Sequence, residues 1–219
     1  MKKLSLKAVV FDFDGTLAKL NIDFSAMRED VLALLSRYGV SPDGLRDLFV
    51  LEMIVAGEDR VSRLRPGEGP EFSKRAYAGI AKIEVQAARR GFLFDGVTEM
   101  LQELRARNIR TGVATRNCLA AVETLFPRID DHVDAVITRE RTPFVKPHPE
   151  HLIRMLKQLD VPPDRAAMVG DHPMDIQTGR DAGARTIGVL TGYSRAEALH
   201  RAGADFLLNG AADILDILA

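Results

Sequence analysis

The sequence contains a single cysteine, Cys118, among its 219 residues. One cysteine excludes an internal disulfide framework and a zinc site built from cysteine ligands. No apolar run approaches the roughly 20 residues that a membrane-spanning helix needs, and the first residues lack the apolar region of a secretory signal peptide. We therefore expect a cytoplasmic protein that has no membrane partner.

The sequence also lacks an excess of charge of either sign. Its 30 Lys and Arg residues balance 31 Asp and Glu residues, which leaves a net charge of −1. Such a chain produces no strong positive field, so we expect no nucleic-acid partner. A hydrophobic content of 46% excludes a disordered chain, and the length suits one domain with a smaller inserted subdomain.

Short apolar runs recur along the chain and predict buried strands. They cover residues 8–11, 110–114, 135–137, 166–169, 186–189 and 205–208, and the last ten residues predict a short helix. Between most of these runs, apolar residues recur at intervals of three and four, as helices require. This alternation predicts an α/β fold with a doubly wound, Rossmann-like parallel sheet and right-handed crossovers.

Residues 19–91 interrupt the alternation and predict an inserted helical subdomain. They contain three helical patterns, at 25–38 with Ser25 as N-cap, at 42–56 and at 71–90. The stretch 57–70 is rich in glycine, proline and charge and predicts an exposed loop. We therefore assign residues 1–18 and 92–219 to the core and residues 19–91 to an α-helical insert that could act as a lid.

The first predicted strand ends in two carboxylates, Asp12 and Asp14, which Gly15 follows. Ligands of doubly wound sheets bind at the carboxyl ends of the strands, so this pair lies where chemistry is expected. The two acids could bind a hard cation, or one could act as nucleophile while the other transfers a proton. The alternative is an acidic turn in which Gly15 provides the tight bend.

A second acidic pair, Asp171 and Asp175, follows the strand predicted at 166–169. Their spacing of four places them on one side of a helix that Pro173 would begin. Each acid alone could simply cap that helix or interact with its dipole. Two acidic pairs at two strand ends nevertheless favour a divalent metal site.

Two further segments carry groups that suit a phosphoryl ligand. Thr115, Arg116 and Asn117 follow the strand predicted at 110–114, where a hydroxyl and free backbone N–H groups could hold phosphoryl oxygens. Lys146 precedes Pro147, which excludes a helical conformation at the lysine. Taken singly, Thr115 or Asn117 is better interpreted as a helix cap, and the lysine as a solvated side chain.

Together, these segments resemble the four ordered motifs of the haloacid dehalogenase-like (HAD) hydrolase superfamily. The motifs are Asp12-Phe13-Asp14-Gly15-Thr16, a strand that ends in Thr115, Lys146-Pro147, and Gly170-Asp171 followed by Asp175. The helical insert resembles the cap of phosphoglycolate-phosphatase-like members. The resemblance covers the whole core and implies a phosphatase that hydrolyses a small phosphorylated metabolite, such as a phosphoglycolate-like or sugar-phosphate-like ester.

The resemblance implies a role for each acid. Asp12 would attack phosphorus to form an aspartyl-phosphate, and Asp14 would protonate the leaving alcohol and later activate water. Mg²⁺ would be bound by Asp12, the backbone carbonyl of Asp14 and Asp171, with Asp175 either beside the ion or in contact with its ligands.

The same resemblance implies a phosphate-binding set around the nucleophile. This set comprises Gly15, Thr115, Arg116, Asn117 and Lys146, of which Thr115 and Lys146 also count as catalytic residues. Lys146 would reduce the repulsion between Asp12 and the phosphate.

Several alternatives stay open at this point. A phosphosugar mutase uses the same aspartyl-phosphate, and a non-catalytic phospho-switch also places an aspartate, a hydroxyl residue and a lysine on a doubly wound sheet. Dehalogenases of the superfamily lack the second aspartate, so Asp14 argues against dehalogenation. The assembly is expected to be a monomer or a homodimer.

Overall fold

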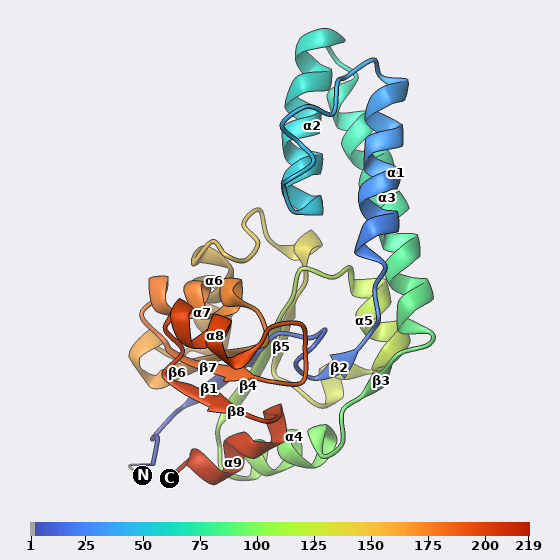
Figure 1. Cartoon of the computed structure of the whole chain (residues 1–219). Helices are drawn as coiled ribbons and strands as arrows, with labels where there is room; N and C mark the ends of the chain where they lie inside the picture. The colour runs from blue at the N-terminus through green and yellow to red at the C-terminus, as the bar shows by residue number, and fades with distance from the viewer. Residues whose placement is uncertain (1–2) are drawn as a thin grey trace. The chain divides into compact units, whose positions relative to one another are not determined.

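The computed structural model describes residues 3–219, which form two compact units (Figure 1). The core unit contains residues 3–20 and 90–219, and the insert unit contains residues 21–89. Residues 19, 20, 90 and 91, which the sequence places in the insert, therefore lie in the core unit of the structure.

The core unit contains a six-stranded parallel sheet, and this confirms the predicted α/β fold. Its strands are β1 (Ala8–Phe11), β4 (Arg110–Ala114), β5 (Ala135–Ile137), β6 (Ala166–Gly170), β7 (Arg185–Val189) and β8 (Phe206–Leu208). The order across the sheet is β5-β4-β1-β6-β7-β8. Because β1 lies between β4 and β6, with Ala8 opposite both Arg110 and Ala166, the three strands end side by side.

Helices cover both faces of this sheet (Figure 1). They are α4 (Val97–Ala106), α5 (Leu119–Leu125), α6 (Glu150–Leu159), α7 (Pro173–Asp181), α8 (Ala196–Ala202) and α9 (Ile214–Ile217). Short 3₁₀ turns span Ile129–Asp131, Arg139–Arg141, Pro163–Arg165 and Ala211–Asp213. The strand order reverses direction at β1, so right-handed crossovers place α4 and α5 on one face and α6, α7 and α8 on the other.

Helix α6 shows how the sequence pattern produces this packing. Leu152, Met155 and Leu156 recur on one side of the helix and are fully or almost fully buried. They pack with Ala8 and Val10 of β1 in one hydrophobic cluster. Burial of each such large side chain contributes about 1.5–3 kcal/mol to the free energy of unfolding. These contacts hold α6 against the central strand.

The insert unit consists of α1 (Phe24–Arg37), α2 (Val50–Leu64) and α3 (Gly69–Ala88), which pack against one another. The predicted N-cap Ser25 is wrong, because the Asp23 carboxylate accepts the Ala26 N–H at 2.9 Å and begins α1.

The bounds predicted for the helix at 42–56 and for the loop at 57–70 are also wrong, although residues 50–56 are helical and residues 65–68 do connect two helices. Helix α2 begins at Val50 and passes through Gly57. A Cβ atom at Gly57 would lie 2.9 Å from side-chain atoms of Leu35 and Phe72, so the glycine permits a close approach between helices. The sequence around Gly57 did not predict this packing role, because the side chains that require a glycine there lie on α1 and α3.

A two-stranded antiparallel ribbon in the core unit joins the two connections to the insert. It pairs β2 (Ala18–Lys19) with β3 (Phe92–Leu93). Strands of two residues are too short to produce an alternating pattern, so the sequence did not predict them.

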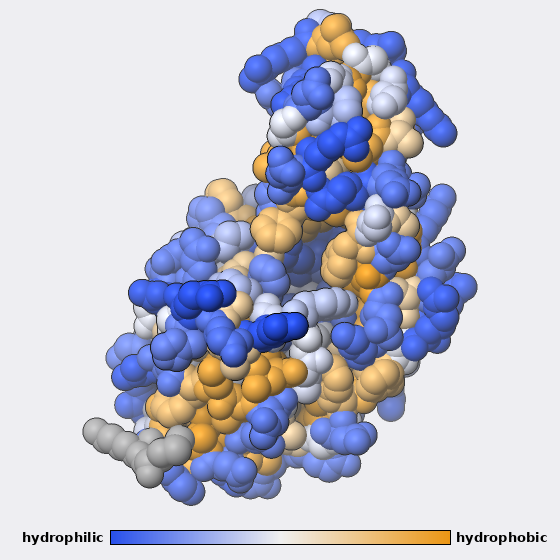
Figure 2. Space-filling model, viewed as in Figure 1, coloured by the Kyte–Doolittle hydropathy of each residue, from blue (hydrophilic) through white to orange (hydrophobic). Residues whose placement is uncertain are grey.

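Polar and charged side chains cover most of the face seen in Figure 2, with smaller hydrophobic areas between them. Among residues 3–219, no helix has the length and apolar character required to cross a lipid bilayer.

Candidate active site

The site is built at the carboxyl ends of the central strands. Asp12 directly follows β1, and its N–H donates to the Val169 carbonyl of β6 at 2.8 Å. The Phe13 N–H donates to Asp12 Oδ1 at 2.7 Å, which fixes the carboxylate against its own backbone. Thr115 and Asp171 follow the two strands that flank β1, so the topology brings these three residues to one edge.

Gly15 provides the turn that the sequence indicates. Its φ angle is +87°, a conformation that favours glycine, and its N–H donates to the Ala18 carbonyl at 2.7 Å. A Cβ atom at this position would lie 2.5 Å from Asp171 Oδ2. Gly15 therefore allows the loop after β1 to approach the loop after β6.

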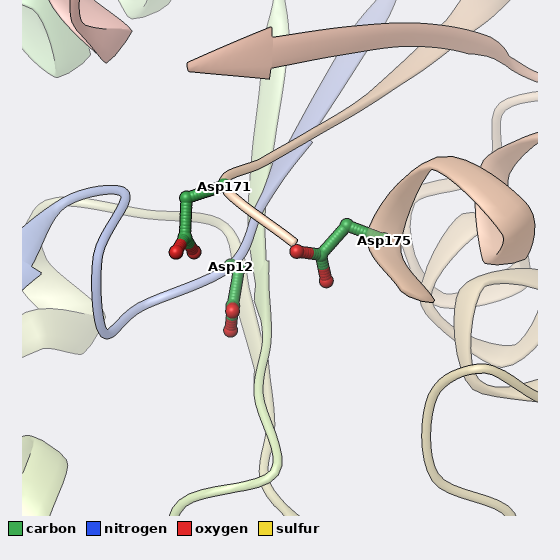
Figure 3. Close-up of side chains that lie close together, drawn as sticks. All are labelled: Asp12, Asp171 and Asp175. Atoms are coloured by element: carbon green, nitrogen blue, oxygen red, sulfur yellow. The ribbon is translucent and has the colours of Figure 1, made fainter. Parts of the chain in front are cut away.

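Asp12, Asp171 and Asp175 form an acidic cluster (Figure 3). One carboxylate oxygen from each residue lies within 4.8 Å of the other two. Asp171 and Asp175 are almost completely buried, whereas the Asp12 side chain is 14% exposed. Asp12 and Asp171 are 159 positions apart in the sequence, yet the fold brings them together with Asp175.

Lys146 is a fully buried cation beside this cluster. Its Nζ lies 2.7 Å from Asp12 Oδ1 and 2.7 Å from Asp175 Oδ1. Burial opposes a charged lysine, but the two carboxylates outweigh it and raise the Lys146 pKa above its usual value. The lysine therefore remains charged and offsets part of the negative charge of Asp12.

The charge balance of the cluster favours a divalent cation. Three carboxylates face one lysine, and burial together with the neighbouring Asp175 and Asp12 raises the pKa of Asp171 to about 8. Such repulsion is relieved when a cation binds, and a set of carboxylate oxygens suits Mg²⁺. The residues present fit the predicted metal.

Asp175 has a protein partner on each of its two carboxylate oxygens. Oδ1 contacts Lys146, and Oδ2 accepts the His172 N–H at 3.0 Å at the start of α7. This arrangement suits a carboxylate that holds Lys146 and the helix terminus in place.

The Asp14 carboxyl group lies outside the acidic cluster. Its Oδ1 accepts the Leu20 N–H at 2.9 Å, and its Oδ2 accepts the Tyr193 hydroxyl at 3.1 Å. Burial, with a smaller contribution from the negative charge of Asp12, raises the pKa of Asp14 to about 6. An acid with such a pKa exchanges protons near neutral pH, as a general acid and base must.

The segment after β4 is locally ordered. The Thr115 hydroxyl donates to Asn117 Oδ1 at 2.8 Å, and the Asn117 N–H donates to Thr115 Oγ1 at 3.2 Å. The Arg116 guanidinium donates to the Lys146 carbonyl, and Arg139 donates to the Arg116 carbonyl at 3.0 Å. Arg116 thus connects two of the predicted motifs, and its assignment to phosphate binding stays a prediction.

His151 supports the site through a contact with the backbone of Lys146. It is completely buried, its Nδ1 accepts the Lys146 N–H at 3.2 Å, and its Nε2 lies 3.1 Å from the Ile137 carbonyl. These partners require a neutral ring with the proton on Nε2. The local sequence pattern does not show that the ring of His151 reaches back to β5.

The buried state of His151 predicts an acid-sensitive fold. Burial, with the positive charge of Lys146, lowers the pKa of His151 to about 4 from its ordinary value of 6.5. Between these values the unfolded chain binds more protons, so stability is lost as the pH falls from 6.5 towards 4. We expect His151 to account for about 2 kcal/mol of lost unfolding free energy between pH 7 and pH 5.

Urea unfolding at the two pH values, compared between the wild type and His151→Asn, checks this expectation. Carboxyl groups that titrate in the same range contribute to both proteins, so the variant should lose about 2 kcal/mol less than the wild type. The exposed His200→Asn variant is the control and should behave like the wild type. An equal loss in His151→Asn would contradict the assignment.

The loop after β7, which contains Thr191, Gly192 and Tyr193, was not predicted to be part of the site. The Thr191 hydroxyl donates to the Gly15 carbonyl at 2.7 Å, and the Tyr193 N–H donates to Asp171 Oδ2 at 2.8 Å. Its position could have indicated a role in the site, because this loop also follows the carboxyl end of a parallel strand.

Comparison with known proteins identifies a family that matches most of the chain. The haloacid dehalogenase-like hydrolase family matches residues 6–183 of the chain. The chain is 28% identical to N-acetylmuramic acid 6-phosphate phosphatase of Pseudomonas aeruginosa, over 100% of this chain and 97% of the relative. It is 30% identical to pyrophosphatase PpaX of Bacillus cereus, over 99% of this chain and 98% of the relative.

Among solved structures, a hydrolase from Pseudomonas syringae has the same fold. It superposes with a TM-score of 0.70 at 20% identity and covers 96% of each chain. At this identity the likeness supports the fold alone.

Proposed function

Because the chain belongs to the haloacid dehalogenase-like hydrolase family, we propose that it is a metal-dependent phosphatase of small phosphorylated metabolites. The observation that carries the proposal is the position of Asp12. Its carboxylate lies 2.7 Å from the buried Lys146 ammonium, at the carboxyl end of the central strand and within the acidic cluster. A carboxylate in this setting suits attack on a phosphate dianion, which Lys146 also attracts.

In the first proposed step, an Asp12 oxygen forms a bond to phosphorus while the bond from phosphorus to the ester oxygen breaks. The electron pair of that bond remains on the leaving oxygen, and Asp14 transfers its proton there to release an alcohol. Asp12 then carries the phosphoryl group as an aspartyl-phosphate. The raised pKa of Asp14, to about 6, supports a protonated fraction that can perform this transfer.

In the second step, a water molecule attacks the phosphorus of the aspartyl-phosphate. The ionised Asp14 accepts a proton from that water, and the bond between Asp12 and phosphorus breaks to release inorganic phosphate. Asp12 and Asp14 return to their starting states. Lys146 would offset negative charge in both steps. We propose that the segment Thr115, Arg116 and Asn117 binds the phosphoryl oxygens.

We further propose that Asp12, Asp171 and the Asp14 backbone carbonyl bind Mg²⁺, with Asp175 beside it. Bound Mg²⁺ would neutralise the transferring phosphoryl group and orient it toward Asp12. Asp175 supports this arrangement through Lys146 and His172, which engage both of its oxygens.

The relatives support a small-molecule substrate. One is named for a sugar phosphate and the other for pyrophosphate, and both align over nearly the whole chain. We therefore propose a phosphorylated small metabolite, such as a sugar phosphate, as the substrate.

Phosphate release from a panel of sugar phosphates, phosphoglycolate, pyrophosphate and other small esters tests the proposal. We expect Mg²⁺-dependent release that EDTA abolishes and that excess Mg²⁺ restores, because the acidic cluster requires a cation. Release that EDTA leaves unchanged would contradict the metal requirement. Transfer of the phosphoryl group to a second sugar hydroxyl, without net phosphate release, would instead identify a mutase.

A further inference from the structure

Tyr193 lies against the carboxyl group that the proposed mechanism uses as general acid. Its hydroxyl donates to Asp14 Oδ2 at 3.1 Å, while the Leu20 N–H donates to Oδ1 at 2.9 Å. The two donors engage both carboxyl oxygens and so define the plane of the group. Asp14 is 7% exposed, which leaves little solvent to replace either contact.

The loop that carries Tyr193 is fixed to the site at two other points. The Thr191 hydroxyl donates to the Gly15 carbonyl at 2.7 Å, and the Tyr193 N–H donates to Asp171 Oδ2 at 2.8 Å. A Cβ atom at Gly192 would lie 2.0 Å from Asp171 Oδ2, so only glycine allows this approach. The backbone of Tyr193 is therefore held independently of its side chain.

The tyrosine ring has a further contact with Lys19. The Lys19 ammonium lies 4.6 Å from the ring centroid, a distance suited to a cation–π interaction. Tyr193 as a whole nevertheless remains 48% exposed, which is unusual for an aromatic residue that serves only to fill a core. The feature that distinguishes this tyrosine from a phenylalanine is its hydroxyl, and that hydroxyl contacts Asp14.

We propose that Tyr193 is a positioning residue for Asp14, which its hydroxyl holds in the orientation that delivers a proton to the leaving oxygen. This inference rests on the proposed phosphatase function. In the step concerned, the Asp14 O–H bond breaks, a new O–H bond forms on the leaving oxygen, and that oxygen keeps the electron pair of its bond to phosphorus. Without the tyrosine hydroxyl, the Leu20 N–H is the one hydrogen-bond donor to the carboxyl group that remains among residues 3–219, and the group can rotate about that contact.

The dependence of kcat/KM on the leaving group distinguishes a role of Tyr193 in positioning Asp14 from a purely structural role. An alkyl phosphate releases a strongly basic alkoxide and needs the acid, whereas 2,4-dinitrophenyl phosphate releases a stable phenolate and does not. The parameter kcat/KM covers the steps up to departure of the leaving group. In Tyr193→Phe, we expect kcat/KM to fall about tenfold for the fastest alkyl phosphate of the panel and to change less than about twofold for 2,4-dinitrophenyl phosphate.

Thr191→Val is the matched control in the same loop. It removes the hydrogen bond to Gly15 but leaves both donors to Asp14 in place, so it should change kcat/KM for the two substrates by the same factor. Circular dichroism and thermal unfolding establish that each variant is folded.

An equal loss on both substrates in Tyr193→Phe, or no loss on either, would overturn the positioning role. The proposed function is judged separately, by wild-type turnover and its disappearance in Asp12→Asn. An active wild type with an unselective Tyr193→Phe variant would thus reject the role of Tyr193 and leave the phosphatase proposal standing.

Discussion

Replacing Asp12 with asparagine should lower phosphate release by at least about a thousandfold, the largest effect that we expect from a single substitution. The amide keeps the size of the carboxylate and can still accept the Phe13 N–H, so the loop after β1 should retain its conformation. It lacks the nucleophilic charge, and it no longer forms an ion pair with Lys146. The loss should therefore appear in catalysis rather than in folding.

Steady-state phosphate release from the best panel substrate measures this effect, with acid-quenched mass spectrometry to detect phosphorylated Asp12 in the wild type. Asp160→Asn is a suitable control, because Asp160 is an exposed residue with a φ angle of +55°, which asparagine tolerates well. It should keep wild-type activity. A folded Asp12→Asn variant that retains a tenth of wild-type turnover would refute the nucleophile assignment.

The second large effect is expected from Lys146→Met. Methionine is similar in length, but it leaves Asp12 and the buried Asp175 without the cation that lies 2.7 Å from each. Removal of one partner from a buried ion pair costs about 3–5 kcal/mol of stability. We also expect turnover to fall by about a hundredfold or more, because the phosphate meets Asp12 without the offsetting charge.

Urea unfolding and phosphate release together test this prediction. The double variant Lys146→Met/Asp175→Asn removes the buried carboxylate as well, so it should recover much of the lost stability while turnover stays low. Lys157→Met, at an exposed position on α6, should match the wild type in both measurements. Wild-type stability and turnover in folded Lys146→Met would disprove the role of the lysine.

The sheet was predictable because its strands are buried, and a buried strand is visible in the sequence as a short run of apolar residues. The observed bounds of β1, β4 and β5 coincide with those predicted from residues 8–11, 110–114 and 135–137. The bounds of α2 were not predictable in this way. They depend on how Gly57 fits against Leu35 and Phe72, and a sequence pattern does not show which distant side chains a glycine will meet.

In the candidate site as well, residues near strand ends were predictable, whereas residues that act through distant contacts were not. Asp12, Asp171 and Asp175 were found because each lies at or near the end of a recognisable strand, and the structure brings them together. The contributions of Tyr193 and His151 depend on contacts with Asp14 and Lys146 that no spacing rule describes.

The short ribbon of β2 and β3 has a consequence for how this protein can vary. Lys19 pairs with Phe92, so the chain leaves the core and returns to it at adjacent points. The entropy of closing such a loop grows only slowly with its length, and the paired residues are the same whatever lies between them. Evolution or protein engineering could therefore shorten, lengthen or exchange the intervening helices as one unit, without changing the sheet or the edge that carries Asp12 and Asp171.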